Sequence, residues 1–497
     1  MKFIKKYFPF ILILVFSYFA FKPVLNSGFF LIHDDTQVAR VYEMTKSLKV
    51  GMFPVRWVFD LGYGFGYPIF NFYAPLSYYY GSIFNILGFD ALSATKIMMV
   101  TGIIMAGIFM YLFVKELFGK IAGIVASLFY VYAPYHALDI YVRGDVSEFW
   151  AYAFIPLVFY GLWKIYKKKS WLFVIISSLG YAGIITSHNL TAMMITPFLL
   201  LYILFLSLAL YKKKQKSSIT YLLCGVFLGV IVSCFYWFPA LSEMKYTNVL
   251  SQIGGGSNFS DHFVCVSQLW TSQWAYGGST LGCVDGLSFM IGKLHILISI
   301  FSAVGVSLLF FSKKQNLNKE KILITVVSFM AFIFSVFLTL ENSKFIWQAV
   351  PLMAFFQFPW RFLLVITFFS SVLTGSFIWL ISFLPIKRFF PHFVLEVSVL
   401  LILLLLFLNI KFFVPQKFLN VNSSYYTSEY SLKWTTSKIS DEYLPKDMRK
   451  PKNAKEALLN KQTFSFQETP IEKLANFISL AGVLLLFAGI IRLKPKV

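Results

Sequence analysis

The chain has 497 residues, of which 58% are hydrophobic, 20% aromatic and 13% charged, and its mean hydropathy is +0.71. A soluble globular domain is roughly one quarter charged, so this composition excludes an ordinary soluble protein and predicts a polytopic membrane protein. The net charge of +22 does not indicate a nucleic-acid partner, because most of the excess lies in lysine clusters between apolar runs, as the positive-inside rule requires of cytoplasmic loops.

The apolar runs have the length of membrane-spanning helices, about 17–25 residues each. We expect about twelve spans, at residues 8–24, 91–114, 121–138, 149–166, 171–187, 191–211, 219–239, 293–311, 322–340, 361–384, 393–412 and 473–491. Both termini carry lysine, so an even number of spans predicts two cytoplasmic ends in a multi-pass protein of the inner or plasma membrane. The first run lacks a clear cleavage site, which favours a retained span over a signal peptide.

The segment 29–80, which follows the first span, carries two adjacent carboxylates, Asp34 and Asp35. Carboxylates beside a membrane are costly to desolvate, so they need a reason to be there. Acid or base chemistry on a lipid-borne substrate is one reason, and a helix N-cap is the other. The polar side chains around this pair are His33, Gln37 and Arg40.

The rest of this segment is dense in glycine, proline and aromatic residues and favours neither helix nor strand. It contains Arg56-Trp57, then Gly62, Gly64 and Gly66, and then Tyr73. We expect a shaped loop against the membrane. The stretch 75–89 is apolar but short, and we expect a membrane-surface helix there because an extra span would break the alternation of basic loops.

The second expected outer loop, residues 135–148, contains Arg143, Asp145 and Glu148. These residues form either an internally ion-paired turn or a second carboxylate site facing the first, with Arg143 holding an anionic group. His188 lies in a very short third outer loop. It is either a hydrogen-bonded interface residue or a proton shuttle or phosphate contact.

The later outer loops carry two further features. Cys265 and Cys283 lie in the long loop 240–292, where an oxidising compartment would permit a disulfide, and the pairing stays open. Trp360-Arg361 ends the loop 341–361. Its arginine either snorkels to the interface or, like Arg56 beside Trp57, clamps a phosphate.

These loops define the expected organisation. Residues 1–412 form the transmembrane bundle, with active-site outer loops at 25–90, 135–148, 240–292 and 341–361. Residues 413–472 form a small outer-side segment, and residues 473–497 form the last span and a cytoplasmic tail. No metal-ligand spacing of cysteine and histidine is present.

The motifs of the first loop resemble a bacterial membrane family named "6-pyruvoyl-tetrahydropterin synthase-related". The resemblance rests on Asp34-Asp35, the segment 54–57, the segment 62–68 and the segment 72–75, with looser similarity at 358–362 and 442–445. More widely, the layout resembles the GT-C glycosyltransferases, which place a catalytic carboxylate in the first outer loop and use polyprenyl-phosphate sugars. The resemblance implies an all-α, GT-C-like bundle with outer loops that carry short helices.

The leading hypothesis is an inverting glycosyltransferase that moves a sugar from a polyprenyl phosphate to a glycan or lipid acceptor on the outer face. Asp34 or Asp35 is the expected general base. The expected substrate-binding residues are His33, Gln37, Arg40, Arg56, Trp57, Tyr73, Arg143, Asp145, Glu148, His188, Trp360 and Arg361. A divalent metal stays open, with no ligands assigned. The alternatives are a lipid or glycan transporter such as a flippase, and a non-catalytic membrane scaffold.

Overall fold

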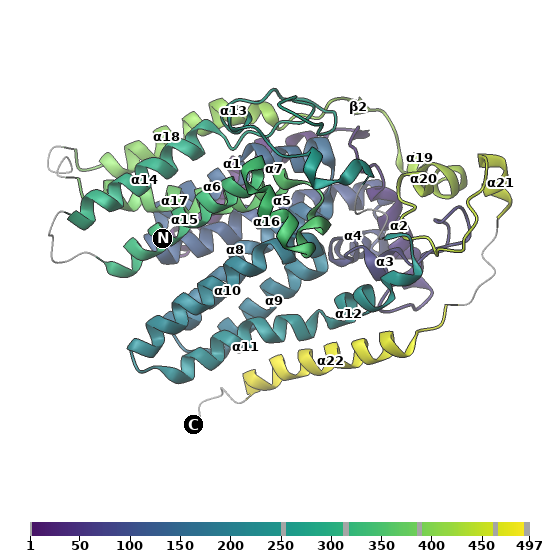
Figure 1. Ribbon diagram of the computed structural model, residues 1–497, viewed down its shortest axis with the longest axis horizontal. Coiled ribbons are helices and arrows are strands. Elements are labelled where there is room, and N and C mark those ends of the chain that lie inside the picture. The colour runs from purple at the N-terminus through teal and green to yellow at the C-terminus, as the bar shows by residue number, and fades with distance from the viewer. Residues whose placement is uncertain (1, 250–254, 312–317, 385–389, 461–465, 492–497) are drawn as a thin grey trace. The chain divides into compact units, whose positions relative to one another are not determined.

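The computed structural model describes residues 2–249, 255–311, 318–384, 390–460 and 466–491 (Figure 1). The described chain is mostly helical. Its strands are β1 (Phe29–Phe30) and β2 (Phe418–Leu419), which pair antiparallel with Phe29 opposite Leu419. The chain divides into two compact units that are each discontinuous in sequence.

The first unit comprises Met1–Pro23, Gly102–Val142 and Gly254–Gln416. Its elements are most of α1 (Lys2–Leu25) and of α5 (Ala91–Phe118), then α6 (Lys120–Val131), α7 (Pro134–Leu138), η1 (Asp139–Arg143), η4 (Gly255–Ser257), η5 (Phe259–Asp261), α13 (Val266–Trp270), α14 (Lys293–Phe311), α15 (Lys319–Thr339), η6 (Glu341–Ser343), α16 (Lys344–Ala349), η7 (Pro351–Phe356), η8 (Pro359–Phe362), α17 (Leu363–Ile381), α18 (Phe393–Asn409) and η10 (Ile410–Phe412). Helix α17 is almost wholly buried and packs against α6, α14 and α15. It is therefore the centre of this unit.

The second unit comprises Val24–Thr101, Arg143–Ile253 and Lys417–Val497. Beside the two strands, its elements are α2 (Gln37–Lys49), α3 (Ile69–Phe72), α4 (Leu76–Ile86), α8 (Val146–Lys167), α9 (Trp171–Ser187), α10 (Asn189–Lys212), α11 (Lys216–Val232), α12 (Cys234–Glu243), η2 (Met244–Tyr246), α19 (Ser423–Thr427), η11 (Ser431–Thr436), α20 (Ser437–Ile439), α21 (Ala454–Leu459) and α22 (Pro470–Ile491).

Glycines lie in the contact between α8 and α9 of the second unit. A Cβ on Gly161 would lie 2.6 Å from the backbone nitrogen of Ser177, and one on Gly180 would lie 2.8 Å from that of Val158. Small residues let two helix backbones approach in this way, which is how membrane helices commonly associate. This pairing lies in the C-terminal half of α8, and the polar residues discussed below lie at its N-terminal end.

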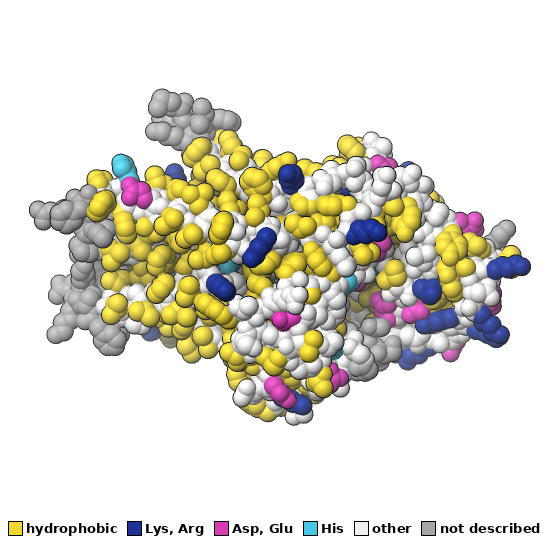
Figure 2. Space-filling view, turned by 90° about the horizontal axis from the view of Figure 1, so that it is seen from above, with side chains coloured by type: hydrophobic (Ala, Val, Ile, Leu, Met, Phe, Trp, Pro, Cys, Tyr) yellow, Lys and Arg dark blue, Asp and Glu magenta, His cyan; other side chains and the backbone are white. Residues whose placement is uncertain are grey.

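Each of the twelve predicted spans coincides with a helix or a pair of helices. Within the described residues, eight helices are long and apolar enough to cross a membrane, and two bent pairs, 120–143 and 216–246, raise the number to ten. The predicted spans 171–187 and 293–311 correspond to shorter apolar helices. Hydrophobic side chains dominate the left part of the face in Figure 2, as expected for a surface in contact with lipid.

Two loop predictions are tested directly. The stretch 75–89 contains α4, whose 11 residues are too few to span a membrane, so the expected short helix is present. The expected outer loop 135–148 carries short helices, as the GT-C resemblance implied for the outer loops: it contains α7 and η1, and α8 begins at Val146. Pro134 at the first position of α7 is compatible with a helix start, since its missing N–H would have no partner there.

Candidate functional site

Backbone hydrogen bonds hold the first-loop carboxylates against the start of α8. The N–H of Asp34 donates to the carbonyl oxygen of Arg143 at 2.9 Å. The side-chain amide of Gln37 donates to the carbonyl oxygen of Gly144 at 2.9 Å, and its amide oxygen accepts from Tyr78 at 2.6 Å. Gly144 has φ +66, and a Cβ there would lie 2.4 Å from Ile32, so this turn requires glycine. Gln37 is therefore placed as a support of the turn.

Arg143 lies between two carboxylates in this turn. Its guanidinium is 2.9 Å from Asp145 and 2.9 Å from Glu148, and all three side chains are buried. Asp145 also caps α8, because its other oxygen accepts from the N–H of Glu148 at 3.0 Å. The segment is an ion-paired turn that lies beside Asp34, and the binding of an anionic group by Arg143 stays a prediction.

His188 joins this group from the break between α9 and α10. A ligand atom each from Asp145, Glu148 and His188 lies within 4.8 Å of the others. Nδ1 of His188 is 2.8 Å from the hydroxyl of Thr191, which orients the ring. Two carboxylates and an imidazole are a donor set that suits a divalent cation.

The two aspartates differ in their surroundings. Burial raises the pKa of Asp34, and the charge of Asp145 raises it further, while Arg143, Arg40 and His33 lower it. Burial raises the pKa of Asp35 to about 6, and the hydroxyl of Tyr426 opposes that rise. Both carboxyls therefore have a pKa above that of an exposed aspartate.

Arg40 is buried within a cluster of tyrosines. Its guanidinium lies 4.1 Å from the centre of the Tyr73 ring and donates to Tyr78 at 3.2 Å and to Ser440 at 2.9 Å. Burial raises the pKa of Glu442, which also feels the charges of Arg40 and Asp34. Glu442 is thus a further carboxyl of this region. Only its place in the motif 442–445 signalled it in the sequence, and no role followed from that.

Arg56 lies apart from this group, in the interior, and is 1% exposed. Its guanidinium donates at 2.9 Å to Asn71, at 2.8 Å to the carbonyl oxygen of Phe235 and at 2.8 Å to Asn476, and it lies 3.6 Å from Glu472. These protein acceptors favour a structural role for Arg56 over the predicted phosphate contact.

Trp57 also packs inside the first loop. A Cβ on Gly66, which has φ +71, would lie 2.5 Å from the indole nitrogen of Trp57. Val58 and Tyr67 form an isolated antiparallel bridge across this loop. The expected shaped loop is thus present, and Trp57 is one of its packing residues.

Three predicted residues remain: His33, Trp360 and Arg361. His33 is exposed beside Asp34. Trp360 and Arg361 belong to the first unit, in η8. The rings of Trp360 and Phe358 stack at 5.1 Å, and the Arg361 guanidinium lies 5.3 Å from the Phe358 ring. Their role toward a substrate stays a prediction.

Solved structures show which fold the chain has. The chain resembles the apo oligosaccharyltransferase of Archaeoglobus fulgidus with a TM-score of 0.51, 12% identity and coverage of 97% of this chain and 65% of that chain. It also resembles the oligosaccharyltransferase AglB of the same organism in complex with an inhibitory peptide and a dolichol-phosphate, with a TM-score of 0.52, 11% identity and coverage of 96% and 64%. The fold is therefore GT-C, and the chain spans slightly under two thirds of those longer proteins.

The family assignment is more specific. The chain belongs to the family described as "6-pyruvoyl-tetrahydropterin synthase related domain; membrane protein", which it matches over residues 70–419. Asp34 and Asp35 precede the matched range. A protein of Lactococcus lactis subsp. cremoris (strain MG1363), described as uncharacterized, is 28% identical over 250 residues, which are 48% of this chain and 41% of that protein.

Proposed function

We propose that this protein is a membrane glycosyltransferase that transfers a sugar from a polyprenyl-phosphate donor to a glycan or lipid acceptor at the outer face of the membrane. The observation that carries the proposal is the convergence of Asp34, Arg143 and Asp145 in one region of a GT-C fold. Carboxyls whose pKa is raised toward neutral pH, beside buried arginines, are suited to acid and base chemistry.

The proposed reaction is a single displacement with inversion. The acceptor oxygen attacks the anomeric carbon, and its proton passes to the carboxylate of Asp34 or Asp35. The bond between the anomeric carbon and the phosphate oxygen breaks, and the polyprenyl phosphate leaves with the bonding electrons. Arg143 and Arg40 are the cations of this unit that would stabilise the charge growing on that phosphate. This replaces Arg56, whose two terminal nitrogens donate to acceptors of the protein.

A divalent cation is a proposed addition to this site. Asp145, Glu148 and His188 supply the donors, and the cation would contribute further positive charge toward the phosphate. Its presence would also redistribute the ion pairs of Arg143, which contacts both carboxylates.

The test uses a strain that lacks the gene, with lipid extracts analysed for an accumulated polyprenyl-phosphate sugar. Asp34→Asn and Asp35→Asn are expressed beside Asp90→Asn, which changes a carboxylate at the start of α5. We expect the wild type and Asp90→Asn to clear the intermediate, and at least one of the other variants to reduce transfer about 100-fold or more.

Normal clearance by both Asp34→Asn and Asp35→Asn, at normal expression, would refute the assigned base. In membranes from the complemented strain, EDTA should stop transfer, and Mn²⁺ or Mg²⁺ should restore it if the proposed cation site is used. Full activity after EDTA treatment would remove the cation from the proposal and leave the aspartates to be judged by their own variants.

A further inference from the structure

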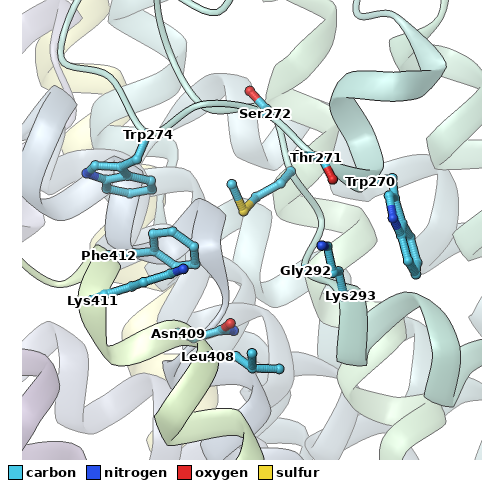
Figure 3. A pocket seen from close by; sticks show the side chains of 11 residues that line it. Trp270, Thr271, Ser272, Trp274, Gly292, Lys293, Leu408, Asn409, Lys411 and Phe412 are labelled. Carbon is cyan, nitrogen blue, oxygen red and sulfur yellow. The ribbon is translucent and has the colours of Figure 1, made fainter.

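A pocket in the first unit lies between the start of α14 and the end of α18 (Figure 3). Its volume is about 390 Å³, within the roughly 300–1,000 Å³ of ligand pockets. Trp274 and Phe412 lie on one side of it in the figure, and Trp270 and Lys293 lie on the other. None of these residues belongs to the candidate site of the second unit.

Two lysines bring positive charge to the pocket. Lys293 is the first residue of α14, and Lys411 follows the last residue of α18 by two positions; both line the pocket and both are exposed. Among the described residues neither ammonium pairs with an acid, and each lies near a ring: Lys293 is 5.8 Å from the centre of Trp270, and Lys411 is 5.2 Å from that of Phe412. Two cations over aromatic walls suit an anion that has an apolar part.

The pocket walls belong to the loop 240–292 and to the end of α18, and hydrogen bonds hold both in place. Cys265 and Cys283 form a disulfide in this loop. The hydroxyl of Ser272, which lines the pocket, donates to Asp285 at 2.6 Å and accepts from the N–H of Phe289 at 3.0 Å. Asn409, at the other wall, donates to the carbonyl oxygen of Tyr132 at 2.8 Å. A site held in this way loses little conformational entropy when a ligand binds.

A second, apolar cavity lies further along the same face of α14. Ile300 and Ser307 lie seven and fourteen residues after Lys293, so all three share one face of the helix, with separations of roughly 10 and 20 Å along its axis. Ile300 and Ser307 line a second cavity of about 330 Å³, together with Val304, Leu308 and Phe329. A hydrocarbon chain that runs down α14 from the first pocket would reach this cavity.

We propose that this pocket binds the phosphate of an anionic membrane lipid between Lys293 and Lys411, with one hydrocarbon chain along α14. Lysines at span ends often only snorkel to the interface. Here two of them line one pocket with two tryptophans, and an apolar cavity lies below on the same helix face. The chemistry required is an anionic phosphate on a long hydrocarbon, which a phosphatidylglycerol and a polyprenyl phosphate both provide.

The experiment is native mass spectrometry of the full chain, purified in detergent and incubated with phosphatidylglycerol, phosphatidylcholine or undecaprenyl phosphate. The wild type should bind one copy of an anionic lipid at least several-fold more tightly than the zwitterionic lipid. Lys293→Gln with Lys411→Gln should weaken that binding roughly tenfold or more. Lys293→Arg with Lys411→Arg should retain it, because the charge is kept.

Lys473→Gln is the matched control, because Lys473 is an exposed lysine in the first turn of another span, α22, and does not line the pocket. Equal binding of the anionic and zwitterionic lipids by the wild type, or unchanged binding by the double glutamine variant, would overturn the proposal. So would displacement of the lipid by inorganic phosphate at the same concentration, since the apolar part would then contribute nothing. The order of affinity between the two anionic lipids identifies which source the site uses.

Discussion

Adjacent aspartates in this chain occupy unlike environments. Asp34 feels the charges of Asp145 and Arg143, whereas Asp35 interacts with the hydroxyl of Tyr426. From the sequence alone, the carboxylate pair beside a membrane span could be recognised as unusual. The sequence could not distinguish the two residues, because their partners come from distant parts of the chain and periodicity does not report such contacts.

At pH 7.5 we expect Asp35→Asn to be more stable than the wild type, by roughly 1–3 kcal/mol. Burial raises the pKa of Asp35 to about 6, so the folded state holds this proton more tightly than the unfolded state does. Stability is therefore lost as the pH rises from the unfolded pKa, near 4, through 6, and the asparagine variant escapes that loss. Thermal unfolding of the detergent-solubilised protein at pH 4 and pH 7.5 measures it.

The stabilising effect should shrink toward pH 4, where Asp35 is protonated in the folded state and about half protonated in the unfolded state. An equal effect of the substitution at both pH values would contradict the raised pKa. Asp90→Asn is a suitable control, because hydrogen bonds lower the pKa of that exposed residue, so its substitution should not stabilise the protein.

At the scale of elements, Arg56 joins the first loop to two helices. Its guanidinium contacts Asn71 in α3, the carbonyl of Phe235 in α12 and Asn476 in α22. In the sequence, an arginine beside proline and tryptophan resembles a phosphate clamp. The neighbouring residues do not show that two of its acceptors lie about 180 and 420 residues later in the chain. The second outer loop was expected from its charged residues, but its short helices α7 and η1 could not be placed residue by residue from the sequence.

Arg56→Met should destabilise the protein by about 3–5 kcal/mol, because it leaves Glu472 without its cation and several buried acceptors without donors. Arg449→Met, at an exposed position, should change stability by less than about 0.5 kcal/mol. Chemical unfolding in detergent compares the two. Unchanged stability of the Arg56 variant together with weaker binding of a polyprenyl phosphate would instead restore the phosphate-clamp interpretation.

At the scale of the whole molecule, hydropathy predicted most of the architecture. Each of the twelve apolar segments is helical, because membrane helices satisfy their own backbone hydrogen bonds and leave a clear signal in the sequence. The division into two units was not foreseeable, since each unit gathers three separate stretches of chain. The disulfide between Cys265 and Cys283 was an open alternative in the sequence, and the structure forms it.

The disulfide offers a test of membrane orientation. If residues 240–292 face the outside, a membrane-impermeant maleimide should label Cys265 and Cys283 in intact cells only after reduction, because a disulfide does not react. Cys224 and Cys234, in apolar helices, should stay unlabelled. Cys265→Ser with Cys283→Ser is the control that should abolish the signal. Labelling that requires permeabilised cells would place this loop on the cytoplasmic side.

The hydrogen bonds between the first loop and the turn before α8 have a consequence for the evolution of this protein. The main-chain N–H of Asp34 donates to the carbonyl oxygen of Arg143, and the carbonyl oxygen of Gly144 accepts from the side chain of Gln37. These contacts do not use the side chains of Asp34 or Arg143. Substitutions of those two side chains can therefore alter reactivity while these backbone contacts remain. Divergent members with new specificities could therefore arise without rebuilding the architecture around them.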